Sequence, residues 1–168
     1  MDKIILREPK YDDYQEFYRL IRKNYSKFSL FLPWVNNKFS IDLARKYIEY
    51  YIINNKKNIE FRYFIIDFDT KDIIGSFSFR NIDIKNNSGE IGFYLDSNYQ
   101  GKGIIQKLFP EFINIISNKI KIENIYAKTL YNNYRSQKTL LRLNFSKIAN
   151  DCGTENDNIL LFKFSNSQ

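Results

Sequence analysis

The chain has 168 residues, of which 43% are hydrophobic and 17% aromatic, and a net charge of +7. This length fits one domain with a sizeable core, and the composition excludes a disordered chain. Histidine is absent and cysteine occurs once, at Cys152, which excludes histidine catalysis, a disulfide framework and a cysteine-based metal site. Because histidine is absent and cysteine occurs once, we expect no metal. Because no long apolar run is present, we expect a soluble cytoplasmic protein with no membrane partner.

The positive charge is concentrated between Asp96 and Ile148, where nine Lys or Arg residues stand against three acidic ones. A polyanionic ligand such as a nucleotide or a coenzyme explains this excess. Nucleic acid explains it equally well. A solvated basic surface is the third explanation, and charge alone does not separate the three.

The first third of the chain reads as a strand followed by two helices. The strand is predicted at Lys3–Arg7, and apolar residues at three- and four-residue spacing predict the helices. The first helix would be capped by Asp12 or Asp13 and the second by Ser40, because these side chains accept hydrogen bonds from helix N–H groups. A polar turn is predicted at Asn54–Asn58.

The remaining elements form an antiparallel meander followed by a strand–helix–strand crossover. This order predicts a mixed sheet with helices on both faces. In the crossover, a helical pattern runs from Ile104 to about Asn118, and Pro110 should kink this helix or end it early. The strands are predicted at 62–68, 73–81, 89–95, 125–130, 145–149 and 158–164, and a last helix is capped by Asn132 or Asn133.

The most informative stretch is a strand, G-E-I-G-F-Y-L at Gly89–Leu95, followed by Q-G-K-G at Gln100–Gly103. A strand, a glycine loop and a helix start together present backbone N–H groups and a positive helix end to an anion. Taken alone, Q-G-K-G is a weak signal. It lacks the Gly-Lys-Ser or Gly-Lys-Thr of a nucleotide loop, and the dinucleotide spacing fails at Lys107. An ordinary strand-to-helix turn is the alternative.

Four motifs in order resemble the GNAT superfamily of acyl-CoA-dependent N-acetyltransferases. Besides the strand and glycine loop, Asn133–Ser136 matches the N-x-x-S of that family, and Leu143–Phe145 stands where L-G-F is usual. F-L-P-W at Phe31–Trp34 and the phrase E-I-G-F-Y-L resemble the branch of ribosomal-protein N-terminal acetyltransferases. The resemblance covers nearly the whole chain. It implies an α+β GNAT fold over residues 1–168, with about seven strands in a mixed central sheet and about four helices.

The resemblance implies acetyl-CoA as co-substrate. Backbone groups at the end of the strand would hold the pantetheine arm and the thioester oxygen as it becomes an oxyanion. The glycine loop would wrap the pyrophosphate, and an asparagine on the next helix would hydrogen-bond the pantetheine. The cofactor-binding residues implied in this way are Phe93, Tyr94, Leu95, Gln100, Gly101, Lys102, Gly103, Ile104, Ile105, Gln106 and Asn133.

The resemblance also implies catalytic groups. Glu90 matches the position at which several family members carry a general base, and an amine of pKa ~10 needs such a base at neutral pH. A strand carboxylate without a catalytic role is the alternative. Ser136 is a candidate proton donor to the departing thiolate, or else it only caps the helix. Many family members place a tyrosine seven residues after the asparagine, where this chain has Leu140.

For the acceptor, the resemblance implies that Trp34 lines the binding groove together with Phe31 and Pro33, with an aromatic plug over the core as the alternative. We therefore expect an enzyme that transfers an acetyl group from acetyl-CoA to a primary amine by direct attack in a ternary complex. The acceptor would be a protein N-terminus or a small molecule. The alternatives are a non-catalytic acyl-CoA-binding module and a basic RNA- or ribosome-binding protein. Nucleic acid is not the expected partner, and a homodimer is left open.

Overall fold

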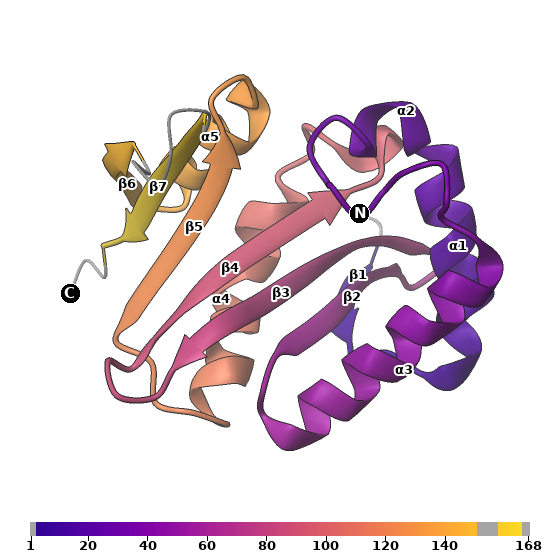
Figure 1. Cartoon of the computed structure of the whole chain (residues 1–168), viewed down its shortest axis with the longest axis horizontal. Coiled ribbons are helices and arrows are strands. Elements are labelled where there is room, and N and C mark those ends of the chain that lie inside the picture. Colours follow the sequence, from indigo (N-terminus) through magenta and orange to yellow (C-terminus); the bar gives the residue numbers. More distant parts are fainter. Residues whose placement is uncertain (1–2, 151–157, 166–168) are drawn as a thin grey trace. The chain divides into compact units, whose positions relative to one another are not determined.

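The computed structural model describes residues 3–150 and 158–165. Seven strands form one mixed sheet in the order β1-β2-β3-β4-β5-β7-β6, as the α+β prediction requires (Figure 1). The strands are β1 (Ile4–Arg7), β2 (Phe61–Asp67), β3 (Ile73–Asp83), β4 (Ser88–Leu95), β5 (Asn124–Leu130), β6 (Phe145–Asn150) and β7 (Ile159–Phe164). The helices are α1 (Tyr14–Lys23), α2 (Tyr25–Phe28), α3 (Ile41–Lys57), α4 (Ile104–Ser117) and α5 (Tyr134–Arg142). Two 3₁₀ turns lie at Tyr11–Asp13 and Ser97–Tyr99.

The chain divides into two compact units, and β3 and β4 contribute to both. The first unit contains residues 1–78 and 93–104, and the second contains residues 79–92 and 105–168. The functional residues predicted from the sequence are therefore distributed over both units. No helix in the described ranges is long and apolar enough to cross a membrane.

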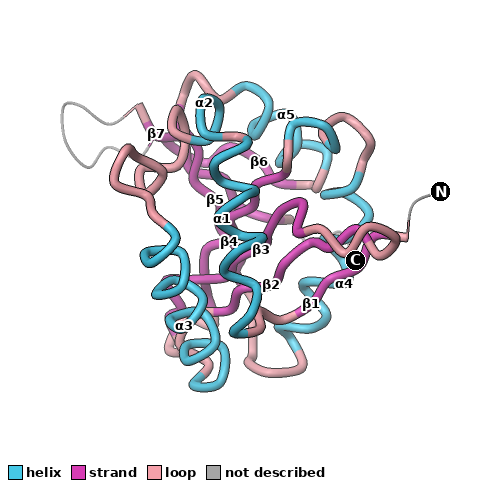
Figure 2. Tube along the Cα trace, turned by 90° about the vertical axis from the view of Figure 1, so that its right-hand side faces the viewer, coloured by secondary structure: helices cyan, strands magenta, loops and turns pink. Residues whose placement is uncertain are grey.

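An aromatic core holds the first unit together. The ring of Phe17 on α1 is fully buried, with Phe39, Tyr51 and Phe64 rings centred 5.7 to 6.1 Å away. Figure 2 shows α1 and α3 side by side over the strands of this unit. Offset and edge-on aromatic contacts of this kind add to the free energy of burial. Aromatic residues thus fill the core of this unit, which explains their high frequency in the sequence.

The second helix extends beyond its predicted end. We expected a polar turn at Asn54–Asn58, but α3 continues to Lys57, and Asn58 closes it in the left-handed conformation (φ 55°). The buried Asn55 amide donates to the carbonyl oxygen of Arg62 at 2.9 Å and accepts from its N–H at 2.7 Å. The turn prediction is wrong because the β2 backbone, and not water, satisfies this polar side chain.

The first helix is shorter than predicted, and its cap differs. The helix breaks at the buried Asn24, and α2 follows as a separate short helix. The Asp13 carboxylate makes no cap bond to the helix. Instead it accepts from the Lys10 N–H at 2.7 Å and forms an ion pair with Arg7 at 2.8 Å. By contrast, the predicted Ser40 cap is confirmed, since its hydroxyl oxygen accepts from the Leu43 N–H at 3.2 Å.

In the second unit, α4 carries the crossover between two parallel strands. β4 and β5 pair from Ser88↔Asn124 to Ile91↔Ala127, which confirms the predicted crossover. Pro110 does not end α4, which continues to Ser117. Pro110 is exposed, so water can reach the backbone carbonyl that it leaves without an intrahelical donor. On the core side, Phe109 packs against Phe145 and Phe164, with ring centroids 5.8 and 5.3 Å away.

Candidate functional site

The segment that leads into the glycine loop is attached to α1. The Asp96 carboxylate is buried and lies 2.7 Å from the Lys23 ammonium. The next residue, Ser97, donates from its N–H at 3.0 Å and from its hydroxyl at 2.5 Å to the same side-chain oxygen of Asn24. Because Asn24 is itself buried, these contacts fix where the chain leaves β4.

Two further hydrogen bonds hold the residues directly before the glycines. The hydroxyl of Tyr99 donates to the Asp67 carboxylate at 2.8 Å, and the Gln100 amide donates to the carbonyl oxygen of Leu95 at 2.7 Å. Burial and the Asp67 carboxylate raise the pKa of Tyr99 to about 12. The hydrogen bond from Tyr99 in turn lowers the pKa of Asp67. The loop is therefore held in place before any ligand binds.

The two glycines of the loop adopt a backbone conformation that side chains disfavour. Gly101 has φ 80° and Gly103 has φ 72°, and an added Cβ at either position would meet no atom within 4 Å. The space next to both glycines is therefore open, and α4 begins directly afterwards at Ile104. Ile105 is buried, as expected for a bulky residue that points into the core. An open left-handed loop at a helix start fits a phosphate group.

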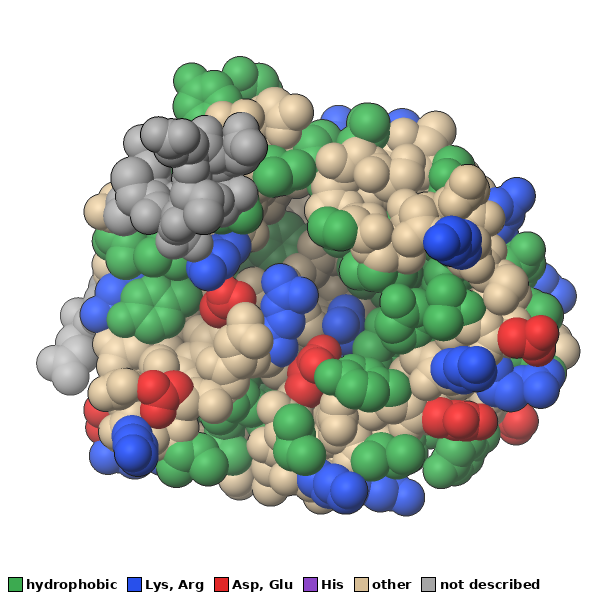
Figure 3. Space-filling model, viewed as in Figure 1, with side chains coloured by type: hydrophobic (Ala, Val, Ile, Leu, Met, Phe, Trp, Pro, Cys, Tyr) green, Lys and Arg blue, Asp and Glu red, His purple; other side chains and the backbone are tan. Residues whose placement is uncertain are grey.

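A hollow of about 500 Å³ adjoins this loop within the first unit. Lys102 and Tyr99 line it from the loop, and Arg19 and Lys23 line it from α1. Lys102 is exposed, with its ammonium 5.1 Å from the centre of the Tyr99 ring. Acidic residues also line the hollow, so it carries charges of both signs. Figure 3 shows a similar interspersion of basic and acidic side chains on the face that it draws.

The end of β4 carries the three residues predicted to hold the pantetheine arm. The Tyr94 side chain is buried among aromatic rings, 5.3 Å from Phe28 and 6.0 Å from Trp34 between centroids. Phe93 is half-buried, with its ring centre 6.2 Å from that of Phe77, and Leu95 is buried. These side chains take part in packing, and the prediction concerns the backbone of the segment. The Tyr94 hydroxyl is also buried without a hydrogen-bond partner among the described residues.

The predicted base, Glu90, lies earlier on β4, and two polar side chains of the described residues lie next to its carboxylate. Glu90 is 9% exposed. The Asn81 amide donates to Oε1 at 2.6 Å, and the Lys128 ammonium lies 3.8 Å from Oε2. The Glu90 carboxylate is therefore buried, and the Asn81 amide and the Lys128 ammonium compensate its charge, as is usual for a buried charged group. Sequence reasoning missed both neighbours, because neither belongs to a motif and only strand pairing brings them to Glu90.

At the start of α5, Asn133 acts as the helix cap. Its side-chain oxygen accepts from the Ser136 N–H at 3.2 Å, so that oxygen is already engaged, and Asn133 rather than Asn132 is the capping residue. Ser136 is half-buried. Leu140, which stands where many family members have a tyrosine, has no hydroxyl. It is 1% exposed and belongs to the core. The tyrosine of α5 is Tyr134, at its first position, and it is exposed.

Thr129 on β5 is a further polar residue that the sequence did not single out. It is buried, and its hydroxyl has no hydrogen-bond partner among the described residues. An unsatisfied buried hydroxyl costs about 1 to 3 kcal/mol, which makes it a candidate for a ligand contact. Cys152, the single cysteine of the chain, lies outside the described residues.

The aromatic residues predicted at the acceptor groove lie partly in the core of the first unit. Trp34 is half-buried, with its ring centre 5.6 Å from Tyr47 and 5.9 Å from Phe39. Phe31 is half-buried and Pro33 is exposed. Trp34 could therefore both cover the core and line an acceptor groove, because one part of its side chain packs while another part is accessible.

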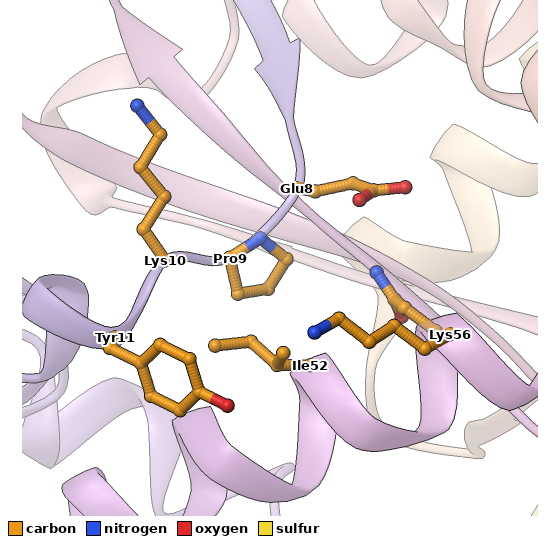
Figure 4. Close-up of a pocket in the computed structure, with 7 residues that line it drawn as sticks. Glu8, Pro9, Lys10, Tyr11, Ile52 and Lys56 are labelled. Carbon is orange, nitrogen blue, oxygen red and sulfur yellow. The ribbon is translucent and has the colours of Figure 1, made fainter.

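A second pocket of about 280 Å³ lies in the first unit between the end of β1 and α3 (Figure 4). Tyr11, Ile52 and Lys56 line it, and the Glu8 carboxylate at its edge accepts a hydrogen bond from Tyr63 at 2.5 Å. None of the residues predicted to bind acetyl-CoA or the acceptor lines it. In the described part of the chain, no group of three or more His, Cys, Asp or Glu side chains could hold a metal ion.

Comparison with known proteins decides the family. A model of the acetyltransferase (GNAT) domain matches residues 3–146. The chain belongs to this family. The acetyltransferase is 27% identical over 128 residues, 76% of this chain and 70% of the relative, to the ribosomal-protein-serine acetyltransferase of Escherichia coli (strain K12). The family match includes β4, the glycine loop and the start of α5, so the sequence-based identification is confirmed.

Solved structures show the same fold. The crystal structure of the microcin C7 self immunity acetyltransferase MccE, in complex with acetyl-CoA and AMP, superposes with a TM-score of 0.85 at 26% identity, covering 97% of this chain and 92% of that one. RimL, a ribosomal L7/L12 alpha-N-protein acetyltransferase in complex with coenzyme A, gives a TM-score of 0.84 at 20% identity, covering 95% and 92%. The acetyltransferase is thus an acetyl-CoA-dependent N-acetyltransferase with the GNAT fold.

Proposed function

We propose that the glycine loop and the end of β4 bind acetyl-CoA. The N–H groups of Gly101 and Gly103 and the start of α4 would hold the pyrophosphate, with Lys102 adding a positive charge. Backbone groups at Tyr94 and Leu95 would hold the pantetheine arm and donate to the thioester oxygen. The open space beside the two left-handed glycines supports this assignment most directly. The proposed set also includes Ile104, Ile105 and Gln106, which begin α4 directly after the glycine loop, and Asn133, which caps α5.

We further propose that Glu90 is the general base. The acceptor amine must lose a proton before it can attack, and Glu90 is the ionisable residue of β4 with a buried carboxylate. One of its oxygens, Oε2, has no hydrogen-bond donor closer than the Lys128 ammonium at 3.8 Å among the described contacts. Attack would be direct, in a ternary complex. Ser136 is the proposed proton donor to the thiolate. The position at which many family members have a tyrosine is occupied here by the core residue Leu140, which has no hydroxyl.

As acceptor we propose the α-amine of a protein N-terminus, received beside Trp34. The relative in Escherichia coli, which aligns over 76% of this chain, is a ribosomal-protein-serine acetyltransferase, and this likeness carries the proposal. A small-molecule amine is the second candidate. The acidic residues near the helices do not favour a polyamine, because Glu8, Asp13 and Glu16 already contact Tyr63, Arg7 and Arg19.

The test incubates the pure protein with acetyl-CoA and matched acceptors. These would be peptides with free N-terminal serine or alanine, the same peptides with a blocked N-terminus and an internal lysine, and spermidine. We expect acetylation of the free N-termini by mass spectrometry, and a fall in kcat of about 10²-fold or more for Glu90→Gln. Acetylation of spermidine alone would contradict the proposed acceptor, and an unchanged kcat in the variant would contradict the proposed base.

Two binding measurements address the alternatives. Tight acetyl-CoA binding without turnover of any amine would favour a non-catalytic module. RNA binding with a steep salt dependence that survives saturating coenzyme A would favour a nucleic-acid partner. We also propose that residues 1–168 act as one catalytic domain, since the family match includes segments of both units, and that the enzyme works in the cytoplasm. A homodimer stays a prediction, which sedimentation velocity would test.

A further inference from the structure

Asn81, near the end of β3, contacts the proposed base from a backbone conformation that is uncommon for a side-chain-bearing residue. Its amide nitrogen donates to Glu90 Oε1 at 2.6 Å, and its φ is 52°. Such a conformation is disfavoured for most residues, although asparagine tolerates it better than others. The residue is itself exposed, so burial of its side chain does not explain its position.

The left-handed conformation has a geometric consequence for the strand. An added Cβ at Gly89 would lie 2.4 Å from the ring of Phe79, so Phe79 and Gly89 share one face of the β3–β4 pair. Glu90, the next residue, projects from the opposite face. Regular alternation would put Asn81 on the face of Phe79, away from Glu90. The departure at Asn81 allows its amide to reach the carboxylate on the other face.

We propose that Asn81 is a positioning residue for Glu90, an inference that rests on the proposed role of Glu90 as base. By holding Oε1, the Asn81 amide fixes the carboxylate in one orientation and leaves Oε2 to take the proton. Oε2 first takes a proton from the ammonium group of the acceptor. The free amine nitrogen then bonds to the acetyl carbon and loses its second proton as the carbon–sulfur bond breaks, so that an electron pair and a proton leave on the sulfur of coenzyme A. Among the described residues, Lys128 on β5 forms an ion pair with this carboxylate, and Tyr126 is the β5 residue that pairs with Glu90.

Two substitutions separate the amide from the backbone conformation. Asn81→Gly keeps the left-handed conformation accessible and removes the donor, whereas Asn81→Asp keeps the shape and replaces the donor with a second carboxylate. We expect kcat to fall about tenfold in Asn81→Gly, with the KM for acetyl-CoA unchanged. In Asn81→Asp we expect a larger fall and an acidic limb of the kcat–pH profile displaced to higher pH, because two carboxylates in hydrogen-bond contact resist ionising together. Asn58→Gly, at another left-handed asparagine that caps α3, is the matched control with unchanged kcat.

A double substitution provides the decisive readout. If Asn81 acts through Glu90, then Asn81→Gly should cause no further loss of kcat in the Glu90→Gln background. An additive loss, or an unchanged pH profile in Asn81→Asp, would overturn the positioning role. If Glu90→Gln alone leaves kcat unchanged, the proposed base fails. If Glu90→Gln is impaired and both Asn81 variants turn over normally, only the inference about Asn81 fails.

Discussion

The hydroxyl of Tyr99 donates a 2.8 Å hydrogen bond to the carboxylate of Asp67, which joins the turn after β2 to the loop that precedes the two glycines. Asp67 is buried and also accepts from the backbone N–H of Asp69 at 3.1 Å. One carboxylate thus orders both the β2–β3 turn and the approach to the glycine loop. The affinity for acetyl-CoA should therefore depend on the hydrogen bond between Tyr99 and Asp67.

Replacing Tyr99 with Phe removes this hydrogen bond and preserves the ring. We expect the KM for acetyl-CoA to rise by about tenfold, because the loop must then be ordered at the expense of binding free energy. The value of kcat should change little, since the amine and its base are unaffected. Steady-state kinetics with varied acetyl-CoA tests this, and Tyr131→Phe at an exposed position is the control. A loss confined to kcat would refute this role for Tyr99.

The same pair predicts a pH dependence of stability. The pKa of Asp67 is lowered in the folded protein, so its contribution is present above the unfolded value, near 3.8, and is lost as the pH falls. The pKa of Tyr99 is raised from 10.0 to about 12, so its contribution is complete below pH 10 and is lost as the pH rises toward 12. The difference in unfolding free energy between wild type and Tyr99→Phe should be constant near neutral pH and shrink at both extremes. Urea denaturation across the pH range measures it.

Substitutions at Gly103 can separate backbone strain from ligand approach. Gly103→Ala should destabilise the protein by about 1 kcal/mol, because φ is 72° there. Gly103→Asn should be better tolerated, since Asn58 and Asn144 adopt the same conformation in this chain. Both side chains would enter the open space beside the loop, so both variants should bind coenzyme A more weakly in calorimetry. Normal binding by a folded Gly103→Asn variant would argue against phosphate contact at this glycine.

Asn55 is expected to matter for stability and not for catalysis. Asn55→Ala leaves the backbone N–H and carbonyl of Arg62 without the partners that Asn55 provides. The expected loss is about 2 to 4 kcal/mol of unfolding free energy, because each buried group is deprived of a hydrogen bond. Urea denaturation measures it, with the exposed Lys57→Ala as control. Equal unfolding free energies for Asn55→Ala and Lys57→Ala would contradict this prediction and would indicate that water replaces the Asn55 amide.

Local patterns predicted much of the fold. Ser40 and Asn133 cap their helices as predicted, and Asn144, which stands where glycine is usual, has the left-handed conformation after α5 (φ 63°). These interactions involve residues at most three or four positions apart, so their geometry follows from the neighbouring sequence. Predictions failed where a residue outside the helix bound the side chain. Asn55 stays helical because β2 binds its amide, and the Asp13 carboxylate at the start of α1 pairs with Arg7 and makes no cap bond.

The family, the strand–loop–helix that suits an anion and the acidic residue on β4 could all be predicted from the sequence, because each depends on residue types at short spacing. What surrounds that acid depends on the fold, which brings Asn81 and Lys128 to Glu90 through strand pairing, and no motif records such pairing. The fold also holds the glycine loop through Asn24 and Asp67, residues 73 and 32 positions from their partners in the chain. Contacts of this range depend on how the strands and helices pack, and packing is a property of the whole chain.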